Sequence, residues 1–244
     1  MMLLEDTDLE TMKRDHNSKK FELNGGFAAG TLVHTKEGLV PIEKIKIGDW
    51  VLSKPENGGE QAYKPIVKIF AHESATVMKV CGEIPDRPNA FERIVSTLDH
   101  QFWVVGQKWT EADDLPKGRF TNGEQFELHD GRHVAIGGCG AIFVSDSPGV
   151  GWMPSYMGDL TRPGILRDFV NDKLISPQAM AIERIQALEK DHPLNSQIAL
   201  EEAEKSDLNY PYLKLPVFDL EVEDFHTYYV GEMGIWVRQT DRGG

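Results

Sequence analysis

Phe27-Ala28-Ala29-Gly30-Thr31 and Pro41-Ile42-Glu43-Lys44-Ile45-Lys46-Ile47-Gly48-Asp49-Trp50-Val51-Leu52-Ser53 are the two segments that decide the fold. The residues between them predict a hairpin, with a strand over 31–35, a turn at 36–38 and a return strand at 39–40. Residues 41–45 then predict one helical turn, and 50–53 the next strand. The first ordered part of the chain therefore reads as a series of short strands.

Further strands are predicted at 62–70 and 76–80, where β-branched residues are frequent and polarity alternates. Short strands at this spacing are typical of a β-sandwich or a barrel-like fold. The chain has 244 residues, of which 40% are hydrophobic, enough for one packed β body with an added segment. We therefore predict a mainly β fold.

A second informative segment is Ile94-Val95-Ser96-Thr97-Leu98-Asp99-His100-Gln101-Phe102-Trp103-Val104-Val105, which Trp109 to Gly118 continues. Side chains on a regular strand alternate between two faces, so Thr97 and His100 would point in opposite directions. A turn or bulge at Leu98-Asp99 would let these two side chains converge.

A third segment closes the chain: Pro216-Val217-Phe218-Asp219-Leu220-Glu221-Val222-Glu223-Asp224-Phe225-His226-Thr227-Tyr228-Tyr229-Val230-Gly231-Glu232, followed by Gly234-Ile235-Trp236-Val237-Arg238-Gln239-Thr240. Its pattern predicts a strand and then a hairpin.

The three segments, taken in this order, resemble a Hint domain, the self-processing fold of inteins, bacterial intein-like domains and hedgehog autoprocessing modules. The closing segment is most similar to the intein-like domains of bacterial polymorphic toxins. The resemblance implies a Hint/intein-like β fold over residues 26–118 and 216–240, with a long insertion at 119–215. One site serves both junctions in this family, so we expect the Cα atoms of Gly26 and Gln239 within about 15 Å of each other.

The resemblance also implies roles at the first junction, where the family places a nucleophile, almost always Cys, directly before Phe27. That thiol attacks the preceding carbonyl and converts an amide into a thioester. Thr97 and His100 match the pair that polarises this amide and protonates its nitrogen. Asp219 matches an Asp that shuttles protons near the same junction.

At the second junction, the family has an Asn whose side-chain amide attacks its own carbonyl, closes an imide and cuts the chain. Gln239 stands at this position and Thr240 follows it. His226 matches a His that assists the cyclisation. Thr240 offers the hydroxyl that splicing inteins need after the junction.

Three of these positions depart from the family pattern. Gly26 has no side chain, so it cannot form a thioester, and the closing segment contains no Cys to replace it. Arg238 stands where the family has an assisting His, and an arginine guanidinium, which keeps its proton, cannot act as a general base. Gln239 closes a six-membered imide, which is slower than the five-membered ring of Asn. The resemblance therefore implies a protein-splicing lineage with defective processing.

Two other functions stay open. A non-catalytic Hint remnant would serve as a folded spacer or binding module of a polymorphic-toxin system. A nuclease carried in the insertion is disfavoured, because residues 119–216 have 9 Lys and Arg against 14 Asp and Glu and lack paired Gly-Asp-Gly helix motifs. The first half of the insertion is Gly-rich and β-like, and helices are predicted from Ser176 to Lys205.

Composition restricts the partners. A net charge of −13 argues against nucleic acid, where Lys and Arg supply most of the affinity. No run approaches the ~20 apolar residues of a membrane span, and the N-terminus has no signal-peptide pattern. We expect a soluble chain, cytoplasmic as encoded, although the resemblance implies a secreted toxin system. The expected substrate is the chain's own flanking polypeptide, with neither nucleic acid nor membrane as partner.

The remaining features suggest no cofactor or metal. Cys81 and Cys139 are too few for a disulfide framework and are expected as buried free thiols. His129 and His133 have the i,i+4 spacing of a helical metal site, but Gly131 between them favours a turn with exposed side chains. Residues 1–25 read as a flexible polar leader, and residues 241–244 as a short tail.

Overall fold

The computed structural model describes residues 25–87, 90–106, 108–116, 123–144, 147–153, 165–171, 173–175 and 212–240, which are mainly β, as predicted. The first half of the chain forms β1 (Phe27–Ala28), β2 (Leu32–Thr35), β3 (Gly38–Pro41), η1 (Ile42–Lys44), β4 (Trp50–Ser53), β5 (Ala62–Glu83), β6 (Phe91–Thr97), β7 (Gln101–Trp103), β8 (Trp109–Glu111) and η2 (Ala112–Asp114). The second half forms β9 (Gln125–Glu127), β10 (His133–Ala135), β11 (Gly140–Ala141), β12 (Phe143–Val144), β13 (Val150–Met153), β14 (Ile165–Asp168), β15 (Lys173–Ile175), β16 (Lys214–Val222), β17 (Thr227–Val230) and β18 (Ile235–Arg238).

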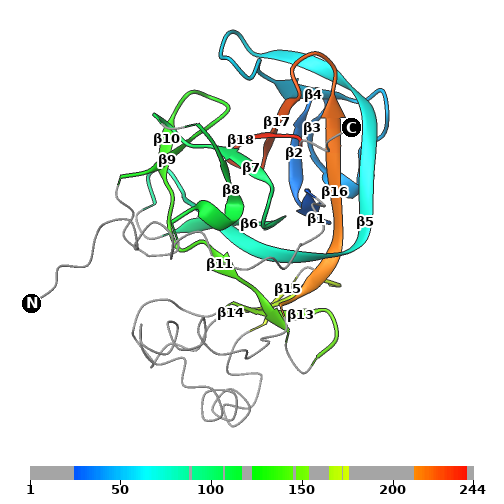
Figure 1. The fold of residues 1–244 in the computed structure, drawn as a ribbon, viewed down its shortest axis with the longest axis vertical. Helices are drawn as coiled ribbons and strands as arrows, with labels where there is room; N and C mark the ends of the chain where they lie inside the picture. The colour runs from blue at the N-terminus through cyan, green and yellow to red at the C-terminus, as the bar shows by residue number, and fades with distance from the viewer. Residues whose placement is uncertain are drawn as a thin grey trace, which may run out of the picture.

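Strand β5 organises the main sheet. It runs unbroken for 22 residues, where the sequence predicted two separate strands at 62–70 and 76–80. The polar residues between those segments stay in the ladder because β16 pairs with them, with His72 opposite Val217 and Ala75 opposite Leu215. One end of β5 pairs with β4 and the other with β6. Figure 1 shows β5 and β16 side by side before β5 curves along the base of the main body.

The main core lies inside this curved sheet. It gathers apolar side chains from both ends of the chain, among them Phe27, Val33, Phe102, Tyr228 and Val237. Strands β9 and β10, which fall in the expected insertion, and the residue after each strand also contribute to it, through Phe126, Leu128, Val134 and Ile136. The main core therefore includes residues 126–139 of the expected insertion as well as the segments on either side of it.

A second, smaller sheet has the order β12-β13-β14-β15 and belongs to the insertion. Its contact with the main body is a separate apolar cluster, in which Ile142 and Met153 pack with Ala28, Val77, Val95 and Val217. The helices expected from Ser176 to Lys205 lie outside the described residues, as do the leader to residue 24 and the tail from 241. Among the residues that the structure describes, no helix is long and apolar enough to cross a bilayer.

The topology brings the beginning and the end of the described chain together. Strand β1 lies between β16 and β6, with Phe27 opposite both Phe218 and Ser96. Strand β18 lies between β17 and β7, with Val237 opposite Phe102. These two strands are separated by several others in the order of the sheet, and the residues beside them, Gly25 and Thr240, nevertheless contact each other.

Candidate functional site

Gly26 is held by Thr97 through its own two backbone groups. The Gly26 N–H donates to Thr97 Oγ1 at 3.1 Å, and the Thr97 N–H donates to the Gly26 carbonyl at 2.9 Å. Thr97 is the last residue of β6 and is buried. The Thr97 hydroxyl therefore lies at the nitrogen of the Gly25–Gly26 peptide, the bond that the resemblance implies this residue polarises.

His100 approaches from the other side of the same junction. Residues 98 and 99 form a turn after β6, as the sequence required for Thr97 and His100 to converge. The His100 ring is fully buried, packs edge-on to Phe27 with ring centroids 4.1 Å apart, and places Nδ1 3.4 Å from Thr240 Oγ1. A buried imidazole beside a hydroxyl can take up or deliver a proton.

Asp219 connects the site to the second junction. It is fully buried in β16. Its Oδ1 accepts hydrogen bonds from the Tyr228 hydroxyl at 2.8 Å and the Leu220 N–H at 2.9 Å, and its Oδ2 accepts one from the Thr240 N–H at 3.1 Å. Since the Thr240 nitrogen belongs to the Gln239–Thr240 peptide, this carboxyl faces the bond that cleavage would break.

Thr240 also lies against the first junction. Its Oγ1 is 1.5 Å from the position that a Cβ on Gly25 would occupy. By standard bond lengths, this puts the hydroxyl within about 4 Å of the Gly25 carbonyl carbon. The same geometry puts the Cα atoms of Gly26 and Gln239 within about 13 Å of each other, in agreement with the expected convergence.

Gln239 and His226 meet through the backbone. The Gln239 N–H donates to the His226 carbonyl at 3.0 Å. His226 has a left-handed φ of 55° and is exposed, and its assisting role in cleavage stays a prediction. Gln239 Oε1 is buried and has no hydrogen-bond partner among the described residues. Among the described residues, the side-chain oxygen of Gln239 therefore has no hydrogen bond that would hold it elsewhere.

Arg238, which stands where the resemblance implies an assisting His, contacts an acidic and an aromatic side chain. Its Nη1 lies 3.6 Å from a Glu56 carboxyl oxygen, and its Cζ lies 5.7 Å from the centre of the Trp109 ring. These contacts hold the guanidinium as a structural cation.

Gly26, where the resemblance implies a nucleophile, has no room for a side chain. A Cβ on Gly26 would lie 2.7 Å from the Phe218 carbonyl oxygen, and the φ of Gly26 is 156°. The obstruction is backbone, so it cannot turn aside as a flexible side chain can. A cysteine here would need β1 to move away from β16.

Sequence reasoning missed two residues of this site. Tyr228 is fully buried, and its ring packs on Phe27 as well as donating to Asp219. Gly25 was read as part of a flexible joint, but its lack of a Cβ is what admits Thr240. The run of aromatic residues at 228–229 was a signal for the first, whereas no local pattern marks the second.

The two cysteines lie outside this site and are buried free thiols, as expected. The Cys81 N–H donates to Cys139 Sγ at 3.5 Å, and burial raises the pKa of the Cys139 thiol to about 12. Neither is therefore an activated nucleophile. Within the described ranges, no group of three or more His, Cys, Asp or Glu side chains could hold a metal ion.

Comparison with known proteins gives one family and a set of structures. The family model described as the pretoxin HINT domain matches residues 32–127. A bacterial intein-like domain from Clostridium thermocellum is 20% identical, with 88% of this chain and 98% of that chain covered and a TM-score of 0.49. A DnaB intein from Synechocystis sp. PCC 6803 is 11% identical, with 89% and 99% covered and a TM-score of 0.47. No curated protein matches the chain.

Proposed function

We propose that this chain, whose residues 32–127 match the pretoxin HINT domain model, is a self-processing domain of the protein-splicing lineage whose thioester step has been lost. The observation that carries the proposal is the position of Thr240, which contacts His100 through its hydroxyl, Asp219 through its N–H and Gly25 through its side chain. One residue thus belongs to both junctions.

The loss of the thioester step follows from Gly26. It has no thiol, and β16 backbone fills the space in which a thiol would lie. Both residues that match the activating pair lie at this junction: Thr97 Oγ1 accepts a hydrogen bond from the Gly26 N–H, and the His100 ring packs against the Phe27 ring. An external or a different internal nucleophile is therefore required at this junction.

Thr240 is the group placed for that role. Its hydroxyl would attack the Gly25 carbonyl carbon, forming an ester as the Gly25–Gly26 C–N bond breaks. The hydroxyl proton would pass by way of His100 to the departing Gly26 nitrogen, so the step needs no co-reactant. A separation of 3–3.5 Å is typical of reacting atoms held for attack, and the hydroxyl is within about 4 Å.

The second junction keeps a slower route. The Gln239 side-chain nitrogen would attack its own backbone carbonyl, close a six-membered imide and release the Thr240 nitrogen. One proton of the side-chain amide moves to that nitrogen, and Asp219 is placed to carry it. Ordering one more rotor than Asn has costs roughly half a kcal/mol, and Arg238 supplies no base.

Intact-mass measurement of the purified chain tests the proposal. We expect added thiol to release no 1–25 fragment, and hydroxylamine, which also cleaves esters, to release it slowly. The matched control is Thr240→Ala, which should release nothing under either condition. Release by hydroxylamine from both chains, or prompt release by thiol from the unmodified chain, would contradict this assignment.

The second candidate is a non-catalytic Hint remnant that serves as a folded spacer or binding module in a polymorphic-toxin system. The closed space at Gly26 and the structural contacts of Arg238 favour it. An unchanged mass for every chain in the same experiment, over prolonged incubation, is the result that would select it.

A further inference from the structure

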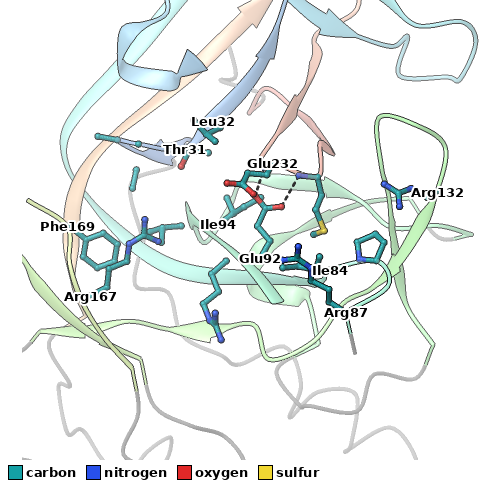
Figure 2. Close-up of a pocket in the computed structure, with 18 residues that line it drawn as sticks. Thr31, Leu32, Ile84, Arg87, Glu92, Ile94, Arg132, Arg167, Phe169 and Glu232 are labelled. Carbon is teal, nitrogen blue, oxygen red and sulfur yellow. Dashed lines mark hydrogen bonds between the residues drawn. The ribbon is translucent and has the colours of Figure 1, made fainter. Parts of the chain in front are cut away.

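The hairpin of β17 and β18, which leads into the second junction, is attached to the main body by side chains at both of its ends. At its turn, the Glu92 carboxyl accepts hydrogen bonds from the backbone N–H groups of Glu232 and Met233, the latter at 3.0 Å, as Figure 2 shows. At the other end, the Tyr228 hydroxyl donates to Asp219 Oδ1 of β16 at 2.8 Å. The second attachment therefore involves Asp219, which also contacts the peptide that cleavage would break.

Tyr228 lies between groups of the two junctions. The residue is fully buried, and its ring packs edge-on to Phe27 and His100, with ring centroids 6.2 and 6.4 Å apart. Asp219, the acceptor of its hydroxyl, is fully buried as well. Away from water a hydrogen bond is electrostatically stronger than at the surface, and a buried polar group that loses one is costly. The bond between Tyr228 and Asp219 therefore holds both side chains firmly.

The direction of the Asp219 carboxyl depends on what its oxygens contact. The terminal torsion of an Asp side chain has a broad energy minimum, so a place on a strand does not fix the plane of the carboxyl group. The Tyr228 hydroxyl and the Leu220 N–H both donate to Oδ1, and Oδ2 then faces the Thr240 N–H at 3.1 Å. Leu220 moves together with Asp219 because it is the next residue. Tyr228 belongs to another strand, so its bond sets the carboxyl relative to the hairpin.

We propose that Tyr228 is a positioning residue of the second junction, whose hydroxyl aims Asp219 at the nitrogen of the Gln239–Thr240 peptide. The proposal rests on the proposed function, in which Asp219 carries a proton from the Gln239 side-chain amide to that nitrogen as the peptide bond breaks. Tyr228 donates a hydrogen bond throughout and keeps its own proton, so it changes neither the atoms nor the charges of the step. Its contribution is the direction of the carboxyl.

Hydrogen exchange at the Thr240 amide, measured by NMR on the full chain, tests this positioning without any cleavage. In Tyr228→Phe the carboxyl is free to turn and holds the Thr240 N–H for a smaller fraction of the time. We expect that amide to exchange at least about tenfold faster, the effect of losing one hydrogen bond. The Gln239 N–H donates to the His226 carbonyl instead and should exchange within about twofold of its rate in the unmodified chain.

Two control variants separate the aiming of Asp219 from a general loosening of the hairpin. Tyr229→Phe removes the same hydroxyl from the next residue, which is also fully buried and accepts a hydrogen bond from Gln61 Nε2 at 2.9 Å. Glu92→Gln weakens the attachment at the turn. Both variants should leave the exchange of the Thr240 amide within about twofold of the unmodified chain.

The rate of cleavage gives a second readout, in a background of Arg238→His with Gln239→Asn, which supplies a base and a five-membered ring closure. Adding Tyr228→Phe should slow the loss of residues 240–244 at least about tenfold, since a misplacement of roughly 1 Å can cost about a hundredfold in rate. Adding Tyr229→Phe should change it less than about threefold. If the background chain loses no tail, the proposed function fails at this junction, and the exchange of the Thr240 amide still decides whether Tyr228 aims Asp219.

Unchanged exchange of the Thr240 amide in Tyr228→Phe would overturn the proposal, and so would equal acceleration in Tyr229→Phe or Glu92→Gln. A double variant checks that the effect passes through Asp219. Tyr228→Phe with Asp219→Ala should exchange the Thr240 amide no faster than Asp219→Ala alone, because the hydroxyl then has no carboxyl to aim. Additive acceleration in the double variant would show that Tyr228 acts on the junction by another route.

Discussion

The two segments that the resemblance assigns as junctions lie together, but they depart from the family pattern in different ways. In the first, Thr97 and His100 match the activating pair, and Gly26 stands where the family has its nucleophile. In the second, Gln239 stands in place of Asn and Arg238 in place of the assisting His, while Thr240 keeps a hydroxyl. On the proposed function, the first junction lacks a reactant and the second lacks a catalyst.

The difference matters because the two losses are not equally reversible. The space for a side chain at Gly26 is occupied by backbone of β16. Arg238 ends β18 and Gln239 follows it, and both positions already carry long, half-buried side chains. The second junction should therefore recover its chemistry by substitution alone, and the first should not.

The largest effect is expected for Arg238→His combined with Gln239→Asn. The change supplies a general base and a five-membered ring closure, and acid–base assistance is typically worth ~10²–10⁴ in rate. Loss of residues 240–244, followed by intact mass, should accelerate by about that factor. Arg238→His with Gln239→Ala is the control and should leave the mass unchanged. An inert Asn-containing variant would place the defect of the second junction elsewhere.

Asp219→Ala should destabilise the fold by about 2–4 kcal/mol, because three donors lose a buried acceptor. The affected groups are the Tyr228 hydroxyl and the N–H groups of Leu220 and Thr240. Asp219→Asn keeps one acceptor oxygen and should cost roughly half as much. Urea unfolding monitored by tryptophan fluorescence measures both. If the Ala variant lowers the free energy of unfolding by less than about 0.5 kcal/mol, the hydrogen bonds of Asp219 do not hold the second junction in place.

Gly26→Ala and Gly25→Ala should separate the two kinds of obstruction. The added methyl group at Gly26 meets backbone and should cost about 1–3 kcal/mol in any background. At Gly25 it meets the Thr240 side chain, so a similar cost should largely disappear when Thr240→Gly is also present. The measurement is the denaturant midpoint of the unmodified chain, of Gly25→Ala, Gly26→Ala and Thr240→Gly, and of the two double variants. Rescue of Gly26→Ala by the same partner change would show that the first junction is not closed by β16.

The smallest effect concerns pH. His34 Nε2 contacts the Gly231 carbonyl at 2.9 Å in the turn of the hairpin that carries the second junction. Burial, with His129 nearby, lowers the pKa of His34 below its usual 6.5. The unfolded chain then takes up the proton first, so stability present above about pH 6.5 is lost as the pH falls.

The loss should amount to less than about 1 kcal/mol by pH 5.5, since His34 is only partly buried. His34→Gln should flatten the pH dependence of the denaturant midpoint, while the exposed His133→Gln should leave it unchanged. If both variants keep the slope of the unmodified chain, another group is responsible.

The sequence predicted the β fold because its short strands and turns have their own local patterns. The roles of Thr97, His100 and Asp219 come from the resemblance of their segments to a family and stay predictions. The sequence did not predict the single strand β5, since the polar stretch 71–75 is kept in the ladder by pairing with β16, far along the chain. The sequence also did not identify Tyr228 and Gly25 as site residues, because their contacts with Asp219 and Thr240 depend on the folded chain and not on a local pattern. His226 differs from these residues, because its exposure accompanies a local feature, its left-handed backbone.

The contact between Gly25 and Thr240 has a consequence for how the domain folds. It joins residues near the two ends of the described chain, so closing it requires the intervening strands to be in place already, and contacts of such long sequence separation form slowly. Any chemistry that needs this contact is silent in a nascent or partly folded chain. On the proposed function, the junction site would become able to react only after the last strand, β18, has joined the sheet.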